Sequence, residues 1–194
     1  MPPLTASDLL SLETYAKARP QIRAKVMEHK KNRTVHLGDH VTLIFEDSLT
    51  ISYQIQEMLR VERIFEQQGI QDELDAYNPL IPDGSNWKAT MMVEYPDVEE
   101  RRIMLARLKG IEKTVWVRVA GFDKVYPIAD EDLERETEDK TSSVHFLRFE
   151  LTPAMIAAAK QGAAIGAGVE HPQYASTVEA LPDAIRASLA ADLD

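Results

Sequence analysis

The residues with the clearest potential for chemistry lie in the segment ISYQIQEMLRVER, residues 51–63. The spacing of its apolar residues predicts a helix, in which Gln54, Glu57 and Glu62 fall among the apolar positions instead of opposite them. Because a buried carboxylate or amide without a partner is costly, each of these side chains needs one. We therefore expect them either to pair with protein groups and lock the helix packing, or to line a ligand pocket.

Two other polar residues of this helix refine the hypothesis. Arg60 follows Glu57 by three positions, a spacing at which the two side chains can pair along a helix. Gln56 falls in the narrow wedge left for solvent, so we expect it to be exposed. The spacing Glu-x-x-Arg also differs from the Glu-x-x-His of a di-iron bundle, so we do not expect that metal centre here.

A second group of candidates lies on predicted strands. His36 and Glu46 come from two strands that pair across a predicted hairpin, residues 34–47. His145 alternates with apolar residues in a predicted strand over 142–151, so we expect it to be a satisfied histidine on the core side. No spacing among the five histidines resembles a known zinc or di-iron motif.

Arg148 lies on the opposite face of the strand that carries His145. Such an arginine can receive a carboxylate or a phosphate, although it more often pairs with a nearby glutamate. One hypothesis is therefore an enzyme in which Glu57 or His145 is a general acid or base for a small anionic substrate held by Arg60 or Arg148. The sequence has no Gly-rich phosphate loop, no Gly-x-Ser-x-Gly elbow and no clear nucleic-acid-binding signature.

The elements that position these residues indicate an α+β fold. The first helix is expected to be interrupted at Pro20, and the helix over 49–68 is expected to stop at Gly69. A strand over 88–95, a helix over 96–109 and a strand over 114–120 form a β-α-β unit, which normally makes a right-handed parallel crossover. We therefore predict a single mixed β-sheet packed with several α-helices, including one β-α-β crossover.

The remaining segments complete a single predicted domain over residues 1–194. Its N-terminal part, residues 1–33, is a helical arm, and its C-terminal part, residues 152–194, is a helix, a strand and a helix. The acid-rich segment 130–140 is expected to be a solvated or mobile loop. Gly166 and Gly168 are expected to weaken the last strand, which follows a short strand over 124–129 and the strand over 142–151.

The amino-acid composition indicates the cellular compartment of the protein and limits its possible partners. The chain has no cysteine, which fits a reducing cytoplasm and excludes a disulfide, a thiolate zinc site and a cysteine-ligated iron–sulfur cluster in this chain. No apolar run approaches the roughly 20 residues of a membrane span, and the N-terminus lacks a signal-peptide pattern. We therefore expect a cytoplasmic protein without a membrane partner, and we predict no cofactor or metal.

The net charge of −10 argues against attraction to nucleic acid. Residues 1–33 nevertheless hold seven basic and three acidic residues, a local charge of +4 that leaves −14 for the rest. The simplest interpretation is a solvated helical face. The alternative is an interaction module that docks an acidic partner through these N-terminal helices.

Five segments together resemble a bacterial family of domains of unknown function: LSLETYAKARPQIRAKVMEHKKNRTVHLG, YQIQEMLRVER, ELDAYNPLIP, VEYPDVEERR and SSVHFLRFEL. The resemblance covers residues 4–151 well and the C-terminal part more loosely. It implies no catalytic residues. It does imply a redox setting, because members of that family are often associated in genomes with rubrerythrin-like proteins and heterodisulfide-reductase-like iron–sulfur proteins.

The leading hypothesis is therefore an accessory or binding protein that serves a rubrerythrin-like or iron–sulfur redox partner. Since this chain has no cysteine, a cysteine-ligated cluster would lie in the partner. The small-molecule enzyme and the plain interaction module stay open as alternatives, and the sequence does not set the oligomeric state.

Overall fold

The structure is a computed structural model that describes residues 2–194, and its helices and strands form the predicted α+β fold. The helices are α1 (Leu12–Lys30), α2 (Ser48–Glu62), α3 (Gln67–Tyr77), α4 (Val98–Arg107), α5 (Pro153–Lys160) and α6 (Asp183–Ala190). The strands are β1 (Thr34–Leu37), β2 (Val41–Phe45), β3 (Asn86–Val93), β4 (Val115–Val119), β5 (Ile128–Ala129), β6 (Val144–Glu150), β7 (Ile165–His171) and β8 (Tyr174–Val178). Short 3-10 helices are η1 (Ala6–Asp8), η2 (Asn78–Leu80) and η3 (Ile111–Thr114).

The strands form two antiparallel sheets, so the predicted single mixed sheet is wrong. A five-stranded sheet has the order β1-β2-β3-β6-β5, and a three-stranded sheet has the order β4-β7-β8. β3 and β4 do flank α4, but β3 pairs on both of its edges with β2 and β6. β4 pairs with β7 in the other sheet, so the predicted parallel crossover does not form.

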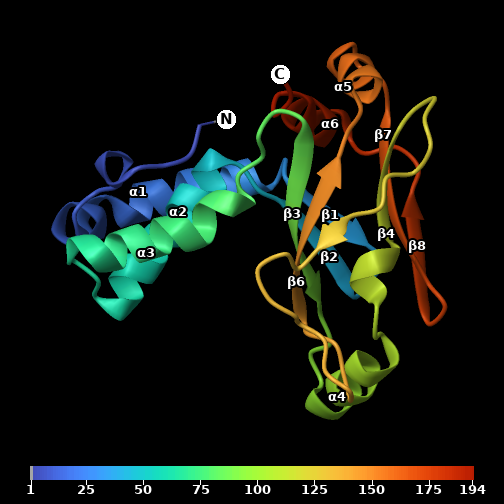
Figure 1. Cartoon of the computed structure of the whole chain (residues 1–194), viewed down its shortest axis with the longest axis horizontal. Coiled ribbons are helices and arrows are strands. Elements are labelled where there is room, and N and C mark those ends of the chain that lie inside the picture. Colours follow the sequence, from blue (N-terminus) through green and yellow to red (C-terminus); the bar gives the residue numbers. More distant parts are fainter. Residues whose placement is uncertain (1) are drawn as a thin grey trace.

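The main hydrophobic core lies between the two sheets (Figure 1). Alternate strand residues point into it, among them Trp87 and Met91 of β3 and Phe149 of β6, which are all 0% exposed. Helix α6 packs against this core, and the Trp87 indole N–H donates to the Leu189 carbonyl at 2.9 Å. The other residues of β3 and β6 therefore point to the outer face of the five-stranded sheet.

Two contacts connect the sheets at their edges. At one edge, Val117 of β4 forms an isolated antiparallel bridge with Val125, three residues before β5. At the other edge, the Tyr174 hydroxyl of β8 donates to the Leu37 carbonyl at 2.6 Å and accepts from the His40 N–H at 3.0 Å. The strand predicted over 124–129 is thus shorter than expected, because its first part bridges to the other sheet.

Replacing Tyr174 with phenylalanine is expected to lower the free energy of unfolding by about 1–2 kcal/mol. The variant keeps the ring but removes the hydroxyl that binds two backbone groups at the sheet edge. Urea denaturation measures the effect. The matched control is Tyr126→Phe, whose ring is 46% exposed and whose hydroxyl binds Glu170 at the surface. An equal loss of unfolding free energy in the two variants would show that the contact at the sheet edge stabilises the fold no more than a surface hydrogen bond does.

The sequence predicted one strand over 163–174, but this part of the chain forms two strands, β7 and β8. Gly168 of β7 allows the Trp116 side chain to lie against the strand, because a Cβ atom there would come within 2.4 Å of the indole ring. The strand thus forms with both glycines, and Gly168 makes room for the indole ring. The C-terminal part is consequently a helix, two strands and a helix.

Helices α1, α2 and α3 form a three-helix arm that extends to one side of the sheets (Figure 1). A second hydrophobic core holds it together, with Ile51, Ile55 and Leu59 of α2 packed against Leu74 and Ile81. No helix within residues 2–194 is long and apolar enough to cross a bilayer. The single-domain organisation stays a prediction.

Helix α1 continues through Pro20, where the sequence predicted an interruption. Tyr15 and Val26, on either side of the proline, are both 0% exposed. Packing of both halves of α1 outweighs the hydrogen bond that proline cannot donate.

The helix predicted over 49–68 is shorter in the structure, and the next helix begins earlier than its sequence, IQDELDAYN, predicted. α2 ends at Glu62, and Arg63 adopts the left-handed conformation with φ 57°. α3 begins at Gln67, so Gly69 lies inside a helix instead of ending one. The left-handed residue turns the chain so that α3 packs back on α2.

Candidate functional site

Glu57 is held by three side chains of the arm. Its Oε1 accepts hydrogen bonds from the Tyr15 hydroxyl and from Arg19 Nε, both at 2.7 Å. Its Oε2 accepts from Arg19 Nη2 at 2.9 Å and from Arg60 Nη2 at 3.4 Å, so the predicted pair along the helix is present. The Arg19 guanidinium lowers the pKa of Glu57 to about 2. Glu57 therefore joins α1 to α2 as a carboxylate paired with protein groups.

The other polar residues of α2 depart from the predicted helical wheel. Glu62 is exposed and Gln54 is half-buried. Gln56, expected at the surface, is 4% exposed. Its Oε1 accepts from the Leu10 N–H at 2.7 Å, and its Nε2 donates to the Leu10 carbonyl at 3.2 Å. The segment before α1 covers the side of α2 that the wheel assigned to solvent, which is why the prediction for Gln56 was wrong.

His36 and Glu46 are not brought together, although their strands pair as predicted. His36 is exposed and lies opposite Thr42, with 3.2 Å between Nδ1 and the threonine Oγ1. Glu46 follows β2 and is 9% exposed. Its carboxylate accepts from the Thr50 hydroxyl at 2.5 Å and from the Thr90 hydroxyl at 2.6 Å. Glu46 is thus a buried carboxylate whose hydrogen-bond donors are neutral.

His145 faces the main core, as predicted, and is 0% exposed. Its Nδ1 lies 2.6 Å from Asp130 Oδ2, and its Nε2 lies 2.9 Å from Thr141 Oγ1 and 3.1 Å from the Ser142 carbonyl. Both ring nitrogens are therefore engaged inside the protein. Within residues 2–194, no group of three or more histidine, aspartate or glutamate residues is arranged to hold a metal ion.

The acid-rich segment 130–140 is mostly exposed, as the sequence predicted for a solvated loop, but its first two residues lie against the sheet. Asp130 Oδ1 accepts from the Phe146 N–H at 2.9 Å. Glu131 forms a two-pronged pair with Arg148, with distances of 2.8 Å to Nε and 2.6 Å to Nη2. These contacts fix the start of the segment on β6, and they show that Arg148 pairs with nearby glutamates.

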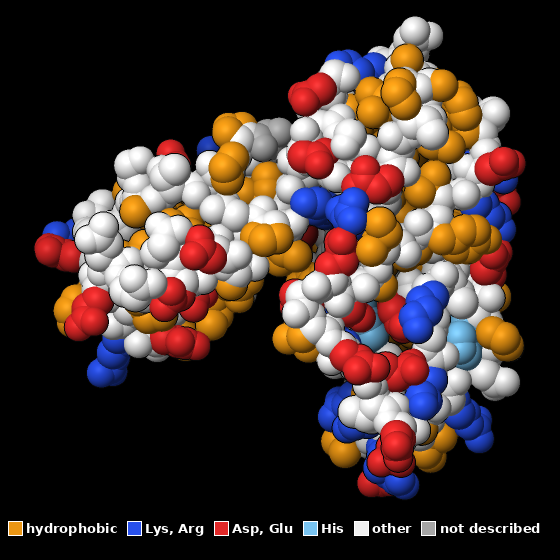
Figure 2. Space-filling model, viewed as in Figure 1, with side chains coloured by type: hydrophobic (Ala, Val, Ile, Leu, Met, Phe, Trp, Pro, Cys, Tyr) orange, Lys and Arg blue, Asp and Glu red, His pale blue; other side chains and the backbone are white. Residues whose placement is uncertain are grey.

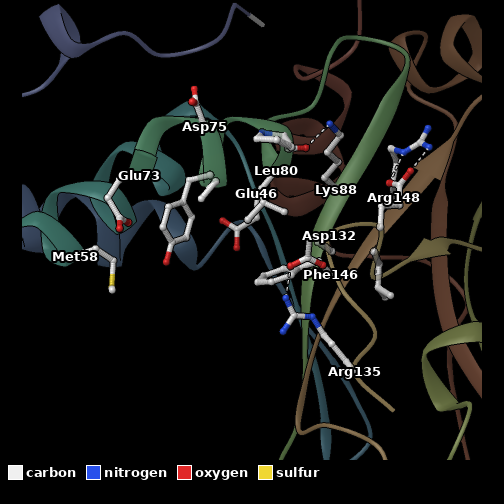
Figure 3. Close-up of a pocket in the computed structure, with 16 residues that line it drawn as sticks. Glu46, Met58, Glu73, Asp75, Leu80, Lys88, Asp132, Arg135, Phe146 and Arg148 are labelled. Atoms are coloured by element: carbon white, nitrogen blue, oxygen red, sulfur yellow. Dashed lines mark hydrogen bonds and ion pairs between the residues drawn. The ribbon is translucent and has the colours of Figure 1, made fainter. Parts of the chain in front are cut away.

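A cleft of about 550 Å³ lies where the three-helix arm meets the outer face of the five-stranded sheet (Figure 3). Figure 2 shows the molecule in the same view as Figure 1, with the arm set at an angle to the body. The walls come from α2, from α3 and η2, from β3 and β6, and from the segment after β5. Of the candidates identified from the sequence, Glu46 and Arg148 line the cleft. The remaining candidates lie outside it: Gln54, Glu57, Arg60, Glu62, His36 and His145.

The arginines in the cleft wall are already paired with carboxylates. Arg148 contacts both Glu131 and Glu150. Arg135 pairs with Asp132, and its Nε lies 3.2 Å from a carboxylate oxygen of Asp130. The positive charges of both guanidinium groups are therefore balanced within the protein.

Two carboxylates of the cleft, in contrast, have no cationic partner within the described residues 2–194. Glu46 accepts only from hydroxyl groups, and Glu73 has no hydrogen bond or ion pair within the described residues 2–194. Burial, together with the charge of Glu62, raises the pKa of Glu73. The ammonium of Lys88 donates to the Pro79 carbonyl at 2.6 Å, and burial lowers the pKa of Lys88. The cleft thus combines apolar surface with carboxylates that lack a cationic partner in the described part of the chain.

Sequence reasoning did not identify Glu73, Tyr77, Lys88 or Arg135 as members of one site. Strand alternation does place Lys88 on the same face as Thr90, away from the core. The meeting of this face with α3 depends on how the arm packs against the sheet, and no local pattern records that arrangement.

The profile of a family described as "Protein of unknown function (DUF3501)" matches residues 3–193. The chain belongs to this family. That result confirms the resemblance to a family of domains of unknown function. The DUF3501 chain is also similar to a crystal structure described as a novel protein of unknown function from Burkholderia pseudomallei K96243, with 55% identity and a TM-score of 0.94. The match covers 98% of this chain and 99% of that chain, and a search of curated proteins finds no match.

Proposed function

We propose that this chain is a cytoplasmic accessory protein that binds a partner through the cleft between the arm and the five-stranded sheet, without catalysing a reaction. The observation that supports the proposal is the cleft itself, which joins apolar walls to carboxylates without cationic partners among residues 2–194. Its volume of about 550 Å³ falls within the range of about 300–1,000 Å³ for ligand sites.

The enzyme hypothesis receives less support from the same geometry. A general acid or base must come within hydrogen-bond reach of the group that exchanges a proton. His145 is fully buried with both ring nitrogens engaged, and both oxygens of Glu57 are bonded to side chains of the arm. Each residue would have to give up structural contacts before it could exchange a proton with a substrate.

The plain interaction module is also less favoured. Two of the N-terminal basic residues, Arg19 and Arg33, are engaged in ion pairs with Glu57 and Asp192. Their charges are balanced internally and contribute little to attracting an acidic partner.

The partner that we propose is a rubrerythrin-like or iron–sulfur redox protein. The support for this part of the proposal is the family resemblance, which implies a redox setting. A cysteine-ligated cluster in such a system would belong to the partner, because this chain has no cysteine.

Replacing Ala76 with tryptophan is expected to reduce recovery of the partner by more than about tenfold. Ala76 is an exposed residue of α3 in the cleft wall, so the indole would occupy space that the partner needs. The measurement is affinity purification of the tagged full chain from its native host, with quantitative mass spectrometry of rubrerythrin-like and iron–sulfur proteins.

The matched control is Ala106→Trp. Ala106 is exposed and lies one residue before the end of α4, as Ala76 does in α3, but it is outside the cleft. Equal recovery with both variants would rule out the cleft as the partner site. If the unmodified chain recovers no rubrerythrin-like or iron–sulfur protein, the redox assignment is wrong.

A further inference from the structure

We infer that the cleft receives a lysine or arginine side chain from a partner protein, while apolar neighbours in the same segment cover the outer face of the five-stranded sheet. This inference rests on the proposed binding function and adds the chemistry of the bound segment. Two features support it independently: the order of side chains on the sheet face, and the balance of charge in the cleft.

The outer face of the sheet is ordered in three cross-strand rows. The row at the cleft is charged, and the next two rows are mainly apolar. From the cleft outward, the rows are Glu46–Lys88–Arg148, Ile44–Thr90–Phe146 and Thr42–Met92–Val144. The apolar side chains of these rows are half-buried and belong to neither hydrophobic core: Ile44, Met92, Val144 and Phe146.

The length of this strip suits a peptide segment. Residues two apart in a strand are separated by roughly 6.6 Å, so three rows extend over about 13 Å. An extended chain spans at most about 3.3–3.6 Å per residue, so about four residues of a partner cover this distance. A segment of that length can place one side chain in the cleft and others on the apolar rows.

Charge complementarity identifies the inserted group. Glu46 and Glu73 are directed toward the same open space in Figure 3, and neither has a cationic partner within residues 2–194. The ammonium of Lys88 is instead turned to the rim, where it donates to the Pro79 carbonyl. A lysine or arginine of the partner would supply the missing charge-assisted hydrogen bonds.

The apolar part of the cleft suits the stem of a basic side chain. Lysine and arginine bury their methylene groups along apolar surface while the charged head reaches a polar partner. Met58 and Leu80 provide such surface in the wall. An aromatic ring of the wall already accepts a cation, since the Arg135 guanidinium lies 4.6 Å from the centre of the Phe146 ring.

The test compares three synthetic tetrapeptides bound to the ¹⁵N-labelled full chain, followed by NMR chemical-shift changes. The peptides are acetyl-Lys-Ser-Phe-Leu-amide and the same sequence with norleucine or glutamate at the first position. We expect the lysine peptide to bind about tenfold more tightly than the norleucine peptide. The preference should decrease as salt is added, because the charges of a partly open cleft are screened.

Two variants connect this preference to the cleft. Glu46→Gln and Glu73→Gln are each expected to reduce the preference for lysine over norleucine. Glu66→Gln removes an equal charge from an exposed residue at the start of α3, outside the cleft, and is expected to keep the preference. Glu73 has no hydrogen-bond or ion-pair partner to lose among the residues that the structure describes, so its variant remains informative if Glu46→Gln disturbs folding.

Several results would overturn the inference. Equal affinities for the lysine and norleucine peptides would mean that the ammonium group does not contribute to binding, although the cleft would still be a binding site. If the glutamate peptide binds most tightly, the cleft binds an anionic side chain instead, through the ammonium of Lys88. If the lysine peptide causes no shifts in cleft residues up to about 10 mM, the inference is wrong. The comparison of Ala76→Trp with Ala106→Trp then decides the binding function separately.

Discussion

Replacing Asp192 with alanine is expected to lower the free energy of unfolding by about 3–5 kcal/mol. Asp192 follows α6 and is 6% exposed, and its carboxylate faces Arg33, which is 1% exposed. The carboxylate oxygens accept from Arg33 Nη1 at 3.0 Å and from Nη2 at 2.6 Å. The variant would leave a buried guanidinium without its main counter-charge, and removal of one member of a buried pair is much more costly than the net contribution of the pair.

The other contacts of Arg33 explain why the loss cannot be recovered locally. Its Nε donates to the Phe45 carbonyl at 3.0 Å and its Nη2 to the Glu46 carbonyl at 2.8 Å. The next carboxylate, on Asp47, is 3.7 Å from Arg33 and already contacts His29 Nε2 at 2.5 Å. Arg33 therefore has too many fixed contacts to turn toward solvent when Asp192 is removed.

Urea denaturation at neutral pH measures this effect, with Asp183→Ala as the matched control. Asp183 lies at the start of α6, its side chain is 98% exposed, and we expect its removal to cost less than about 1 kcal/mol. The double variant Arg33→Met with Asp192→Leu is expected to regain part of the lost stability, because the buried guanidinium is removed together with its counter-charge. A cost below about 1 kcal/mol for Asp192→Ala would contradict the argument.

The same pair illustrates the limit of prediction from sequence. Arg33 and Asp192 are separated by almost the whole chain, and nothing in the pattern around either residue indicates their contact. Local features were predicted more successfully. The hairpin of β1 and β2 and the core-facing position of His145 follow from alternation along a strand, which a few neighbouring residues determine.

Predictions failed where distant segments decide the outcome. The β-α-β pattern around α4 was read correctly as two strands and a helix, but their assignment to different sheets depends on β7, far along the chain. Gln56 was assigned to solvent because the wheel of one helix does not include the segment that covers it.

In the candidate site too, the residues on strands were predicted from local patterns, whereas those that depend on the packing of distant segments were not. Glu46 was identified because its strand was expected to pair with that of His36 across the hairpin, and Arg148 because it lies among apolar strand residues. Glu73 belongs to α3, whose packing against α2 begins with the left-handed turn at Arg63. Because arginine rarely adopts that conformation, residue type did not indicate the turn.

Replacing Glu57 with glutamine is expected to lower the free energy of unfolding by about 2 kcal/mol at neutral pH. The amide keeps the shape of the side chain but loses the charge that binds Arg19 and Arg60, and one of the two acceptor oxygens. Tyr15, which is 0% exposed, also loses a charged acceptor for its hydroxyl. The expected cost is moderate because both arginine side chains are partly exposed and their charges are screened by solvent.

The dependence of this cost on pH separates an ionic contact from simple packing. The pKa of Glu57 is about 2 in the folded protein, below its ordinary value of 4.5. The carboxylate therefore stabilises the folded state fully above the unfolded pKa, and this contribution is lost as pH falls from 4.5 toward 2. The stability difference between the unmodified chain and Glu57→Gln should accordingly fall to less than half of its neutral value at about pH 3.

Urea denaturation of both proteins at neutral pH and at about pH 3 measures that difference. The control is Glu62→Gln, an exposed glutamate of the same helix, which we expect to change stability by less than about 0.5 kcal/mol at neutral pH. A difference between the unmodified chain and Glu57→Gln that stays constant over this pH range would mean that Glu57 acts through packing alone. The contact between α1 and α2 would then be held by Tyr15 and the apolar residues of the arm, and not by the carboxylate.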